Sequence, residues 1–310
     1  MATTIPTLKL NDGNSIPVIG FGTGTALSKR RQETPGFNKD LVEILKSAIK
    51  QGIRHIDGAQ GYGNEEEIGV AIKESGVPRK ELFITTKVRD IKDLPGAIDV
   101  SLEKLQLEFV DLYLIHQPRE ELADLKKAWL ELEAIKKAGK AKSIGVSNHL
   151  HRHLEAILEV ATIVPAVNQI EFHPYLQRAH NLVPWSKEHG IVTTSYNGLT
   201  PLRKGAGGPL DGPLKEIAKK HGVSENAVLI QWQIRQDVVP ITTSSKPERI
   251  AEYLQGVGLK LSKEEVEEIT SLAHMRVFSE SSILNDRQPV TPVPSWFGLE
   301  RSDINQEFPN

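Results

Sequence analysis

The feature that most restricts the fold of this sequence is an alternation of short, β-branched segments with longer amphipathic ones, repeated eight times. The strand-like segments are 18–23, 54–59, 82–88, 110–116, 141–147, 166–172, 191–196 and 238–244. The helix-like segments that follow them are 39–52, 64–76, 96–106, 122–140, 153–162, 182–190, 213–236 and 247–256. Several strands are apolar on both faces, as expected where helices cover one side and a barrel interior lies on the other. Eight repeats in this length predict an α/β fold of the (β/α)8 TIM-barrel type, because an open doubly wound sheet usually stops near six strands.

The two ends of the chain lie outside this repeat. A turn signal at Asn11–Asn14 predicts an N-terminal β-hairpin that caps one end of the barrel. From about Arg276 a Pro-rich tail with Trp296 and Phe297 is expected to cross the other end without forming helices or strands. No linker-like stretch divides the chain, so residues 1–310 are predicted to form one domain. Glycines are expected to close five of the helices, at Gly52, Gly76, Gly139, Gly190 and Gly222.

Composition excludes several classes of function. Lys and Arg number 38 and Asp and Glu 40, so the chain lacks the positive charge that binding to nucleic acid or an acidic membrane requires. There is no cysteine, which excludes disulfides, thiolate nucleophiles and zinc–thiolate sites and is compatible with a reducing compartment. The first residues do not resemble a secretory signal, and no apolar run approaches the ~20 residues of a membrane span. We therefore expect a cytoplasmic protein with neither a membrane nor a nucleic-acid partner.

Three ionisable residues are predicted to meet at one end of the barrel. Asp57, Lys87 and His116 end three successive strands, and barrel active sites lie at the carboxyl ends of the strands. A lone buried carboxylate costs several kcal/mol, so Asp57 needs a partner, and Lys87 is the candidate. The alternative for these residues is a structural ion pair beside a hydrogen-bonded histidine.

Together these segments resemble one family. The stretch "HIDGAQGYGNEEEIG" (residues 55–69) is similar to a signature of the aldo-keto reductases. "FITTKV", "LYLIHQP", "IGVSN", "VNQIEFHP" and "PERI" also match that family in order and cover nearly the whole chain. The resemblance implies an NADP-dependent reductase of aldehydes or ketones with a catalytic tetrad of Asp57, Tyr62, Lys87 and His116.

The chemistry of these side chains agrees with that assignment. Tyr62 can give a proton to a carbonyl oxygen that becomes an alkoxide, but a phenol pKa near ~10 is high for acid catalysis at neutral pH. An ammonium from Lys87 beside the phenol is expected to lower that pKa, and Asp57 would keep Lys87 charged and oriented. His116 is expected to hydrogen-bond the substrate carbonyl and set its orientation.

A hydride donor must come from a cofactor, since no side chain here supplies one. The stretch Gly20–Thr25 has G-x-G-x-G spacing and no helix soon after it, which argues against a Rossmann site. The resemblance implies instead an extended NADPH. Gly22, Thr23 and Asp57 would lie at its nicotinamide side, Ser147, Asn148 and Gln169 at the carboxamide, Tyr196 on the ring, and Asn197 and Leu199 near the pyrophosphate.

The segment after the eighth strand is expected to bind the 2′-phosphate of NADPH. Thr243, Ser244, Ser245, Lys246 and Arg249 supply hydroxyls and two cations at the start of a helix. Two charge-assisted hydrogen bonds of ~1.5–3 kcal/mol each would favour NADPH over NADH by roughly a hundred-fold or more. The alternative is a surface helix that begins with incidental basic residues.

Some positions depart from the common pattern of the family. The segment "PITTSSKPERI" resembles the corresponding segment of a fungal branch of the family. That branch includes conjugated polyketone reductases, ketopantoyl-lactone reductases and D-arabinose dehydrogenases. Gln117 stands where Trp is common, and Arg89 and Asp90 stand where apolar or aromatic residues are frequent. Asn197 replaces a serine and Tyr253 an asparagine. The polar pocket residues favour an oxygenated substrate such as a dicarbonyl, a ketolactone or a sugar-like compound.

Other readings of the sequence stay open at this point. His149, His151 and His153 could suggest a metal, but they begin a helix without nearby carboxylates, so a solvated helix start and no metal site are predicted. The run "KEEVEEIT" is expected to be an exposed helix face. The rival functions are a cofactor-binding regulatory subunit without turnover and a metal-dependent barrel hydrolase. A monomer is expected, with a weak dimer as the alternative.

Overall fold

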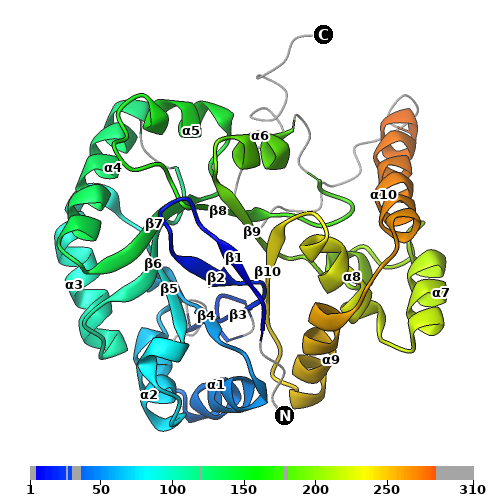
Figure 1. Cartoon of the computed structure of the whole chain (residues 1–310), viewed down its shortest axis with the longest axis horizontal. Helices are drawn as coiled ribbons and strands as arrows, with labels where there is room; N and C mark the ends of the chain where they lie inside the picture. The colour runs from blue at the N-terminus through cyan, green and yellow to red at the C-terminus, as the bar shows by residue number, and fades with distance from the viewer. Residues whose placement is uncertain (1–4, 26, 30–35, 119–120, 178–180, 284–310) are drawn as a thin grey trace.

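Eight parallel strands close into a barrel, as predicted from the alternation (Figure 1). The computed structural model describes residues 5–25, 27–29, 36–118, 121–177 and 181–283, with side chains as far as residue 273. The order around the barrel follows the chain, and the last strand pairs with the first through Ile241 and Gly20. The strands are β3 (Gly20–Gly22), β4 (His55–Asp57), β5 (Phe83–Val88), β6 (Val110–Ile115), β7 (Ala141–Ser147), β8 (Val167–Glu171), β9 (Val192–Tyr196) and β10 (Val238–Thr242).

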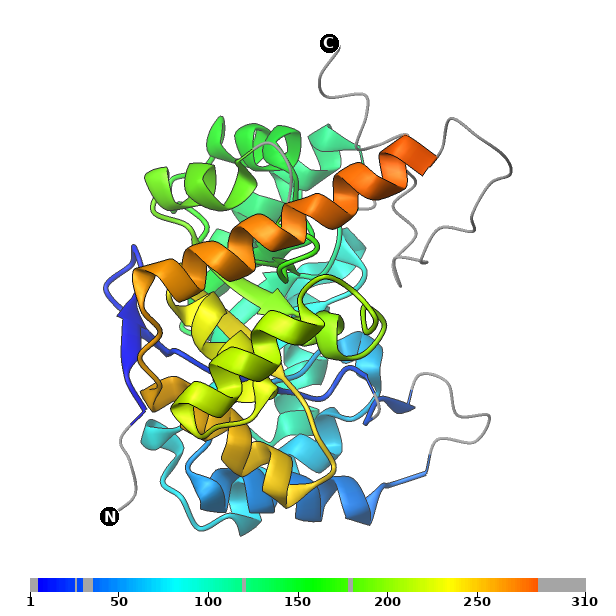
Figure 2. The same cartoon turned by 90° about the vertical axis from the view of Figure 1, so that its right-hand side faces the viewer.

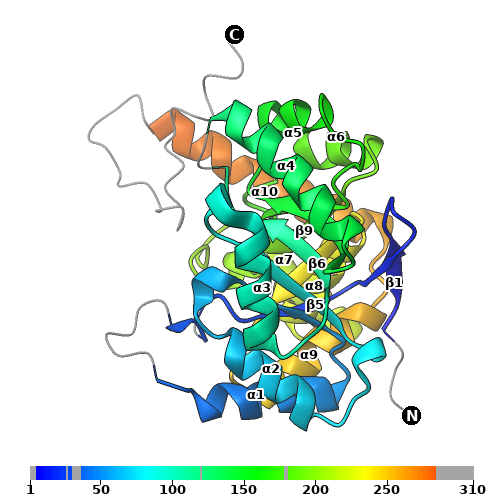
Figure 3. The same ribbon diagram turned by 90° about the vertical axis from the view of Figure 1, so that its left-hand side faces the viewer.

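The predicted N-terminal hairpin is present and closes the amino end of the barrel. It consists of β1 (Thr7–Lys9) and β2 (Ser15–Pro17), paired antiparallel. Its turn is fastened by Asn11 Nδ2, which donates to the carbonyl of Pro165 at 2.9 Å just before β8. Leu10 and Ile16 pack with Leu112, Leu114 and the other apolar side chains of the lower barrel interior. The opposite, carboxyl end of the barrel is therefore the one left for a site, and Figure 3 shows β1 at the edge of the molecule.

Ten helices lie outside the strands in the described part of the chain. They are α1 (Lys39–Gln51), α2 (Glu65–Glu74), α3 (Leu94–Leu105), α4 (Leu122–Lys137), α5 (His151–Leu158), α6 (Leu182–Glu188), α7 (Asp211–His221), α8 (Glu225–Ile234), α9 (Pro247–Gly258) and α10 (Lys263–Ile283). Their buried faces and the outward faces of the strands form the main core, which includes Trp129, Trp232 and Tyr253. None of the described helices is both long and apolar enough to cross a bilayer.

Two predictions about helices were wrong. The single helix expected over residues 213–236 is two helices, because Gly222 takes a left-handed conformation (φ 65°) and Ser224 caps α8 by accepting from Ala227 N. The helix near the C-terminus continues past Arg276 to Ile283, where an irregular tail was expected. Figure 2 shows α10 running along the outside of the barrel, and Trp232 Nε1 of α8 donates to Thr270 Oγ1 of α10 at 3.1 Å. The rest of the expected tail, residues 284–310, lies outside the described residues.

The glycines expected at helix ends are confirmed there by backbone geometry. All five have positive φ, with values of 115°, 70°, 78°, 72° and 65° for Gly52, Gly76, Gly139, Gly190 and Gly222. Gly52 N–H also donates to the carbonyls of Ala48 and Ile49, which ends α1 directly before β4. Such positions favour glycine because a Cβ is strained at these angles.

Candidate active site

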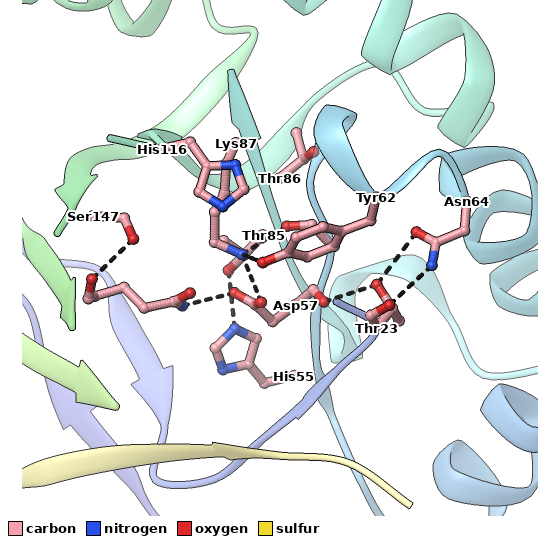
Figure 4. A network of polar contacts seen from close by, with 12 residues as sticks. Thr23, His55, Asp57, Tyr62, Asn64, Thr85, Thr86, Lys87, His116 and Ser147 are labelled. Atoms are coloured by element: carbon pink, nitrogen blue, oxygen red, sulfur yellow. Dashed lines mark hydrogen bonds and ion pairs between the residues drawn. The ribbon is translucent and has the colours of Figure 1, made fainter. Parts of the chain in front are cut away.

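Three strands deliver Asp57, Lys87 and His116 to the carboxyl end of the barrel, as the sequence predicted. Asp57 ends β4, Lys87 is the fifth residue of β5, and His116 directly follows β6. Alternation along the strands points them inward, above a layer that includes His55 and Thr85. Figure 4 shows the amine of Lys87 at the centre, between Asp57 and Tyr62.

Lys87 is completely buried and fully engaged. Its Nζ donates to Asp57 Oδ1 at 2.6 Å, to the carbonyl of Gly58 at 2.8 Å and to Tyr62 Oη at 3.4 Å. Burial by itself lowers the pKa of a lysine, but the Asp57 carboxylate and Tyr62 outweigh it and hold the pKa of Lys87 above its ordinary value. The ammonium form is therefore stable at any physiological pH.

Asp57 is fixed by a second partner that was not anticipated in this role. Gln169 Nε2 donates to Asp57 Oδ2 at 2.8 Å across the barrel from β8. Both carboxylate oxygens thus accept hydrogen bonds, one from an ammonium and one from a neutral amide. A buried carboxylate satisfied in this way has a single orientation toward Lys87.

Tyr62 reaches the group from a short 3₁₀ turn, Gln60–Tyr62, between β4 and α2. Its ring meets the ring of His116 edge-on, with centroids 5.4 Å apart. The backbone of Gly24 lies against the other part of the ring, and a Cβ at Gly24 would come within 2.3 Å of Tyr62 Cζ. A side chain at residue 24 would therefore displace the phenol.

Residues 23–25 and 27–29, which include Gly24, are held by Asn64 and by Glu67 of α2. Asn64 Nδ2 donates to the carbonyls of Thr23 and Leu27, each at 3.0 Å. Lys29 Nζ forms a buried ion pair of 2.7 Å with Glu67 Oε1. These contacts link the position of Gly24 beside the phenol to the first turns of α2.

The residues expected at the nicotinamide lie together beside the tetrad. Ser147 Oγ donates to the Gln169 carbonyl at 2.8 Å, and Asn148 Nδ2 donates to the His116 carbonyl at 3.1 Å. Tyr196 Oη donates to Asn148 Oδ1 at 2.7 Å. Gly22 and Thr23 are adjacent to Asp57, because Gly22 pairs with it in the sheet and Thr23 N donates to its carbonyl at 3.0 Å. Asn197, at φ 57°, donates to Glu171 Oε1, and Leu199 is buried.

The residues expected at the 2′-phosphate surround the start of α9. Ser245 and Lys246 are exposed and Arg249 is half-buried, while Ser244 Oγ accepts from Lys246 N at 3.0 Å. Tyr253 Oη donates to the carbonyl of Thr243 and so fastens the segment from below. The buried hydroxyl of Thr243 has no protein partner in the described part of the chain. The cations of Lys246 and Arg249, together with the exposed Ser245 at the start of the helix, suit a phosphate.

Two of the three histidines at this helix start, His149 and His153, are buried, which corrects the prediction of a solvated helix start. His149 is fully buried, its Nδ1 contacts the Ser147 carbonyl at 2.9 Å, and its ring meets that of His153. Burial lowers the pKa of His149 to about 3. The described residues contain no group of three or more side chains able to hold a metal ion.

Comparison with known proteins decides the family. The model of the aldo/keto reductase family matches residues 18–274. The chain belongs to the aldo/keto reductase family. It is therefore an oxidoreductase of a family that reduces carbonyl groups of small molecules.

Relatives of this aldo/keto reductase include fungal enzymes, in line with the fungal branch it resembles. It is 40% identical over 274 residues to an NAD/NADP-dependent indole-3-acetaldehyde reductase of Schizosaccharomyces pombe, covering 86% of this chain and 96% of that one. It is 38% identical to an NADPH-dependent alpha-keto amide reductase of Saccharomyces cerevisiae, covering 85% and 89%.

Solved structures agree with the fold of this aldo/keto reductase. An aldo-keto reductase of Bombyx mori in complex with NADP superposes with a TM-score of 0.78 at 31% identity, covering 87% of this chain and 94% of that one. An aldo/keto reductase of Brucella melitensis gives 0.77 at 36% identity, covering 87% and 100%.

Sequence reasoning missed several residues that shape the site of this aldo/keto reductase. The bond of Gln169 to Asp57 crosses 112 positions in the chain and leaves no local signal. Asn64 precedes α2 and would be taken for an N-cap, but its side chain makes no capping bond and holds residues 23–25 and 27–29 instead. Lys29 and Glu67 are likewise paired only by the fold.

Proposed function

We propose that this aldo/keto reductase reduces an aldehyde or ketone to the alcohol with NADPH, and that Tyr62 gives the proton. The observation that carries the proposal is the chain of contacts from Gln169 through Asp57 and Lys87 to Tyr62 Oη. It places an ammonium of raised pKa 3.4 Å from a phenol oxygen. The Lys87 ammonium already has the Asp57 carboxylate as its counter-ion. A purely structural ion pair would therefore not need the Tyr62 phenol beside it.

Proton transfer from Tyr62 leaves a phenolate, which is the species that Lys87 would stabilise. Because Lys87 is fully buried, opposite charges this close interact more strongly than in bulk solvent. Asp57 keeps Lys87 in the charged form through the reaction, since its Oδ1 accepts from Nζ at 2.6 Å. Gln169 prevents Asp57 from rotating away, because it binds the other oxygen.

His116 would orient the substrate carbonyl. Its ring is nearly buried and meets Tyr62 edge-on, so an oxygen that accepts from Tyr62 Oη also lies beside the imidazole. Two donors on one oxygen fix the direction of the carbonyl and stabilise the developing alkoxide.

The chemistry of the surrounding side chains fits NADPH, which when bound would supply the hydride. Amide and hydroxyl groups of Ser147, Asn148 and Gln169 suit its carboxamide, and the half-buried ring of Tyr196 suits stacking. At the far end the exposed hydroxyl-bearing side chain of Ser245 and the cations of Lys246 and Arg249 suit a phosphate. One relative described as NADPH-dependent, another described as NAD/NADP-dependent and a neighbour in complex with NADP support the same cofactor.

For the substrate we propose a carbonyl compound with further oxygen functions, such as a dicarbonyl or ketolactone. Gln117 and Arg89 make the wall beside His116 polar where the family often has aromatic side chains. Relatives described as an alpha-keto amide reductase and a methylglyoxal reductase act on compounds of this kind.

A reductase panel tests the proposal. Oxidation of NADPH and of NADH is followed in parallel with dicarbonyls, ketolactones, aldoses and aryl aldehydes. Turnover with NADPH, fastest for the oxygenated ketones, is expected. Tight NADPH binding without turnover of any substrate would mean a regulatory subunit. Rates that rank simple aryl aldehydes far above every dicarbonyl and ketolactone would contradict the substrate class.

A further inference from the structure

Arg89 stands at the mouth of the candidate active site. It lies two residues beyond Lys87 and directly follows the end of β5. Its backbone N–H donates to Gln60 Oε1 at 3.4 Å, so it is tied to the short turn that carries Tyr62. The side chain is exposed. The backbone of Arg89 is therefore linked to the turn that carries Tyr62, while its side chain is exposed to solvent.

The stem of Arg89 lies close to His116 across Gly61. A Cβ at Gly61 would be 3.7 Å from Arg89 Cδ and 3.9 Å from His116 Nδ1. The Arg89 stem and the imidazole thus flank the same small space, which the absence of a side chain at residue 61 leaves open. The Arg89 guanidinium, at the end of this stem, would therefore lie near a substrate carbonyl held by His116 and Tyr62.

In the part of the chain that the structure describes, the charge of Arg89 has no carboxylate partner. Lys87, the other cation of the site, is paired with Asp57. Among the described residues no carboxylate forms an ion pair with Arg89. Its neighbour Asp90 is engaged locally, because Asp90 Oδ1 accepts from Lys92 N at 3.1 Å. Within the described residues, the Arg89 guanidinium therefore has no ion-pair partner, and its stem lies beside the place where a substrate would sit.

We propose that Arg89 determines specificity by binding a carboxylate of the substrate, so that keto acids and aldehyde acids are preferred substrates. A guanidinium presents two parallel N–H donors that match the two oxygens of a carboxylate. The inference rests on the proposed reductase function and deepens it, since it adds an anionic group to the carbonyl compound.

Matched substrates and variants test this proposal with the full-length enzyme and NADPH. Phenylglyoxylate is compared with methyl phenylglyoxylate, and 3-carboxybenzaldehyde with its methyl ester, so that each pair differs in one charge. The variants are Arg89→Gln and Arg89→Lys. Lys92→Gln is the control, because it removes an exposed cation three residues away that makes no contact with Gly61.

Arg89→Gln is expected to lower kcat/KM for both acids about 10- to 100-fold and to leave both esters within about two-fold. Arg89→Lys should recover part of the loss, because it keeps the charge but not the bidentate geometry. Lys92→Gln should behave as wild type. Equal effects of Arg89→Gln on acids and esters, or none on either, would overturn the proposal.

The proposal and the reductase function fail in different ways. If wild type reduces the esters and Arg89→Gln leaves the acid-to-ester ratio unchanged, the role of Arg89 is wrong and the reductase function stands. If wild type oxidises no NADPH with any of the four compounds or with phenylglyoxal, the reductase function itself is wrong.

Discussion

Gln169 donates a hydrogen bond from Nε2 to Asp57 Oδ2 at 2.8 Å, which joins opposite sides of the barrel beneath the candidate active site. Residue 169 was expected to contact a cofactor amide, and in the structure its side chain hydrogen-bonds the buried carboxylate of Asp57. The same side chain therefore connects the proposed nicotinamide site with the Asp57–Lys87 pair. A change at residue 169 is expected to affect the stability of the protein as well as its affinity for NADPH.

Gln169→Leu is predicted to lower the free energy of unfolding by about 1–3 kcal/mol, because it leaves a buried carboxylate oxygen without a donor. Urea denaturation measures this loss. Gln231→Leu is the control, since Gln231 is also buried but its Oε1 has no partner among the described residues. Equal losses for the two variants would show that the bond to Asp57 contributes nothing.

Asp57→Asn is predicted to cost about 3–5 kcal/mol at pH 7, because it leaves the Lys87 ammonium buried without a counter-ion. In wild type the pKa of Lys87 lies above 10.5, so the contribution of Lys87 is complete below pH 10.5 and is lost only at higher pH. In the variant burial lowers that pKa, so stability should rise between pH 7 and 10.

Urea titrations at pH 7, 8 and 9 measure how the free energy of unfolding changes with pH in wild type and in Asp57→Asn. The double variant Asp57→Asn/Lys87→Met removes both charges and should be more stable than the single variant at pH 7. A single variant whose stability is flat over this pH range would contradict the pairing.

The eight strands, and the clustering of Asp57, Tyr62, Lys87 and His116, could be predicted from sequence because each depends on a local pattern. Strand segments such as 110–116 and 238–244 are short, apolar and β-branched runs between helical patterns, and the signature around Tyr62 is contiguous. The sequence also contains the signal for the break between α7 and α8. Gly222 ends the first helix and Ser224 caps the second.

Contacts between distant residues could not be predicted in the same way. Asn64 has the sequence context of a helix cap. Its side-chain amide instead donates hydrogen bonds to the carbonyls of Thr23 and Leu27. The burial of His149 depends on how α5 packs on the barrel, which its hydrophilic neighbours in "NHLHRH" conceal. Pairings of this kind are fixed by tertiary structure and have no local period.

Glu67→Gln is predicted to destabilise the protein by about 3–5 kcal/mol and to reduce turnover. It leaves Lys29 buried without a counter-ion and loosens the segment that places Gly24 against the Tyr62 ring. Glu74→Gln is the control, because its ion pair with Lys46 is exposed and such pairs contribute about 0–1 kcal/mol. Urea denaturation and NADPH oxidation measure the two effects. A loss no larger than that of the control would contradict a structural role for the pair.

Stability is predicted to fall as the pH drops below 6.5. Burial lowers the pKa of His149 to about 3 and that of His55 to about 4, so both are neutral in the folded state and bind protons on unfolding. The stabilisation is complete above pH 6.5 and is lost as pH falls toward these values, at about 1.4 kcal/mol per pH unit for each histidine.

The variant His149→Gln should reduce the slope of unfolding free energy between pH 6 and 5 by about one proton. His189→Gln, which changes an exposed ring, should leave the slope as in wild type. An unchanged slope in His149→Gln would show that this imidazole is protonated in the folded protein.

The identity of the proton donor is tested most directly by Tyr62→Phe, with NADPH affinity and single-turnover reduction of a dicarbonyl measured on the same preparation. The variant loses one hydroxyl that lies 3.4 Å from Lys87 Nζ and keeps the ring that fits between Gly24 and His116. NADPH affinity within about two-fold of wild type, with a reduction rate below about a hundredth, is the result we predict. A variant that binds NADPH normally and reduces the dicarbonyl at more than about a tenth of the wild-type rate would show that another group supplies the proton.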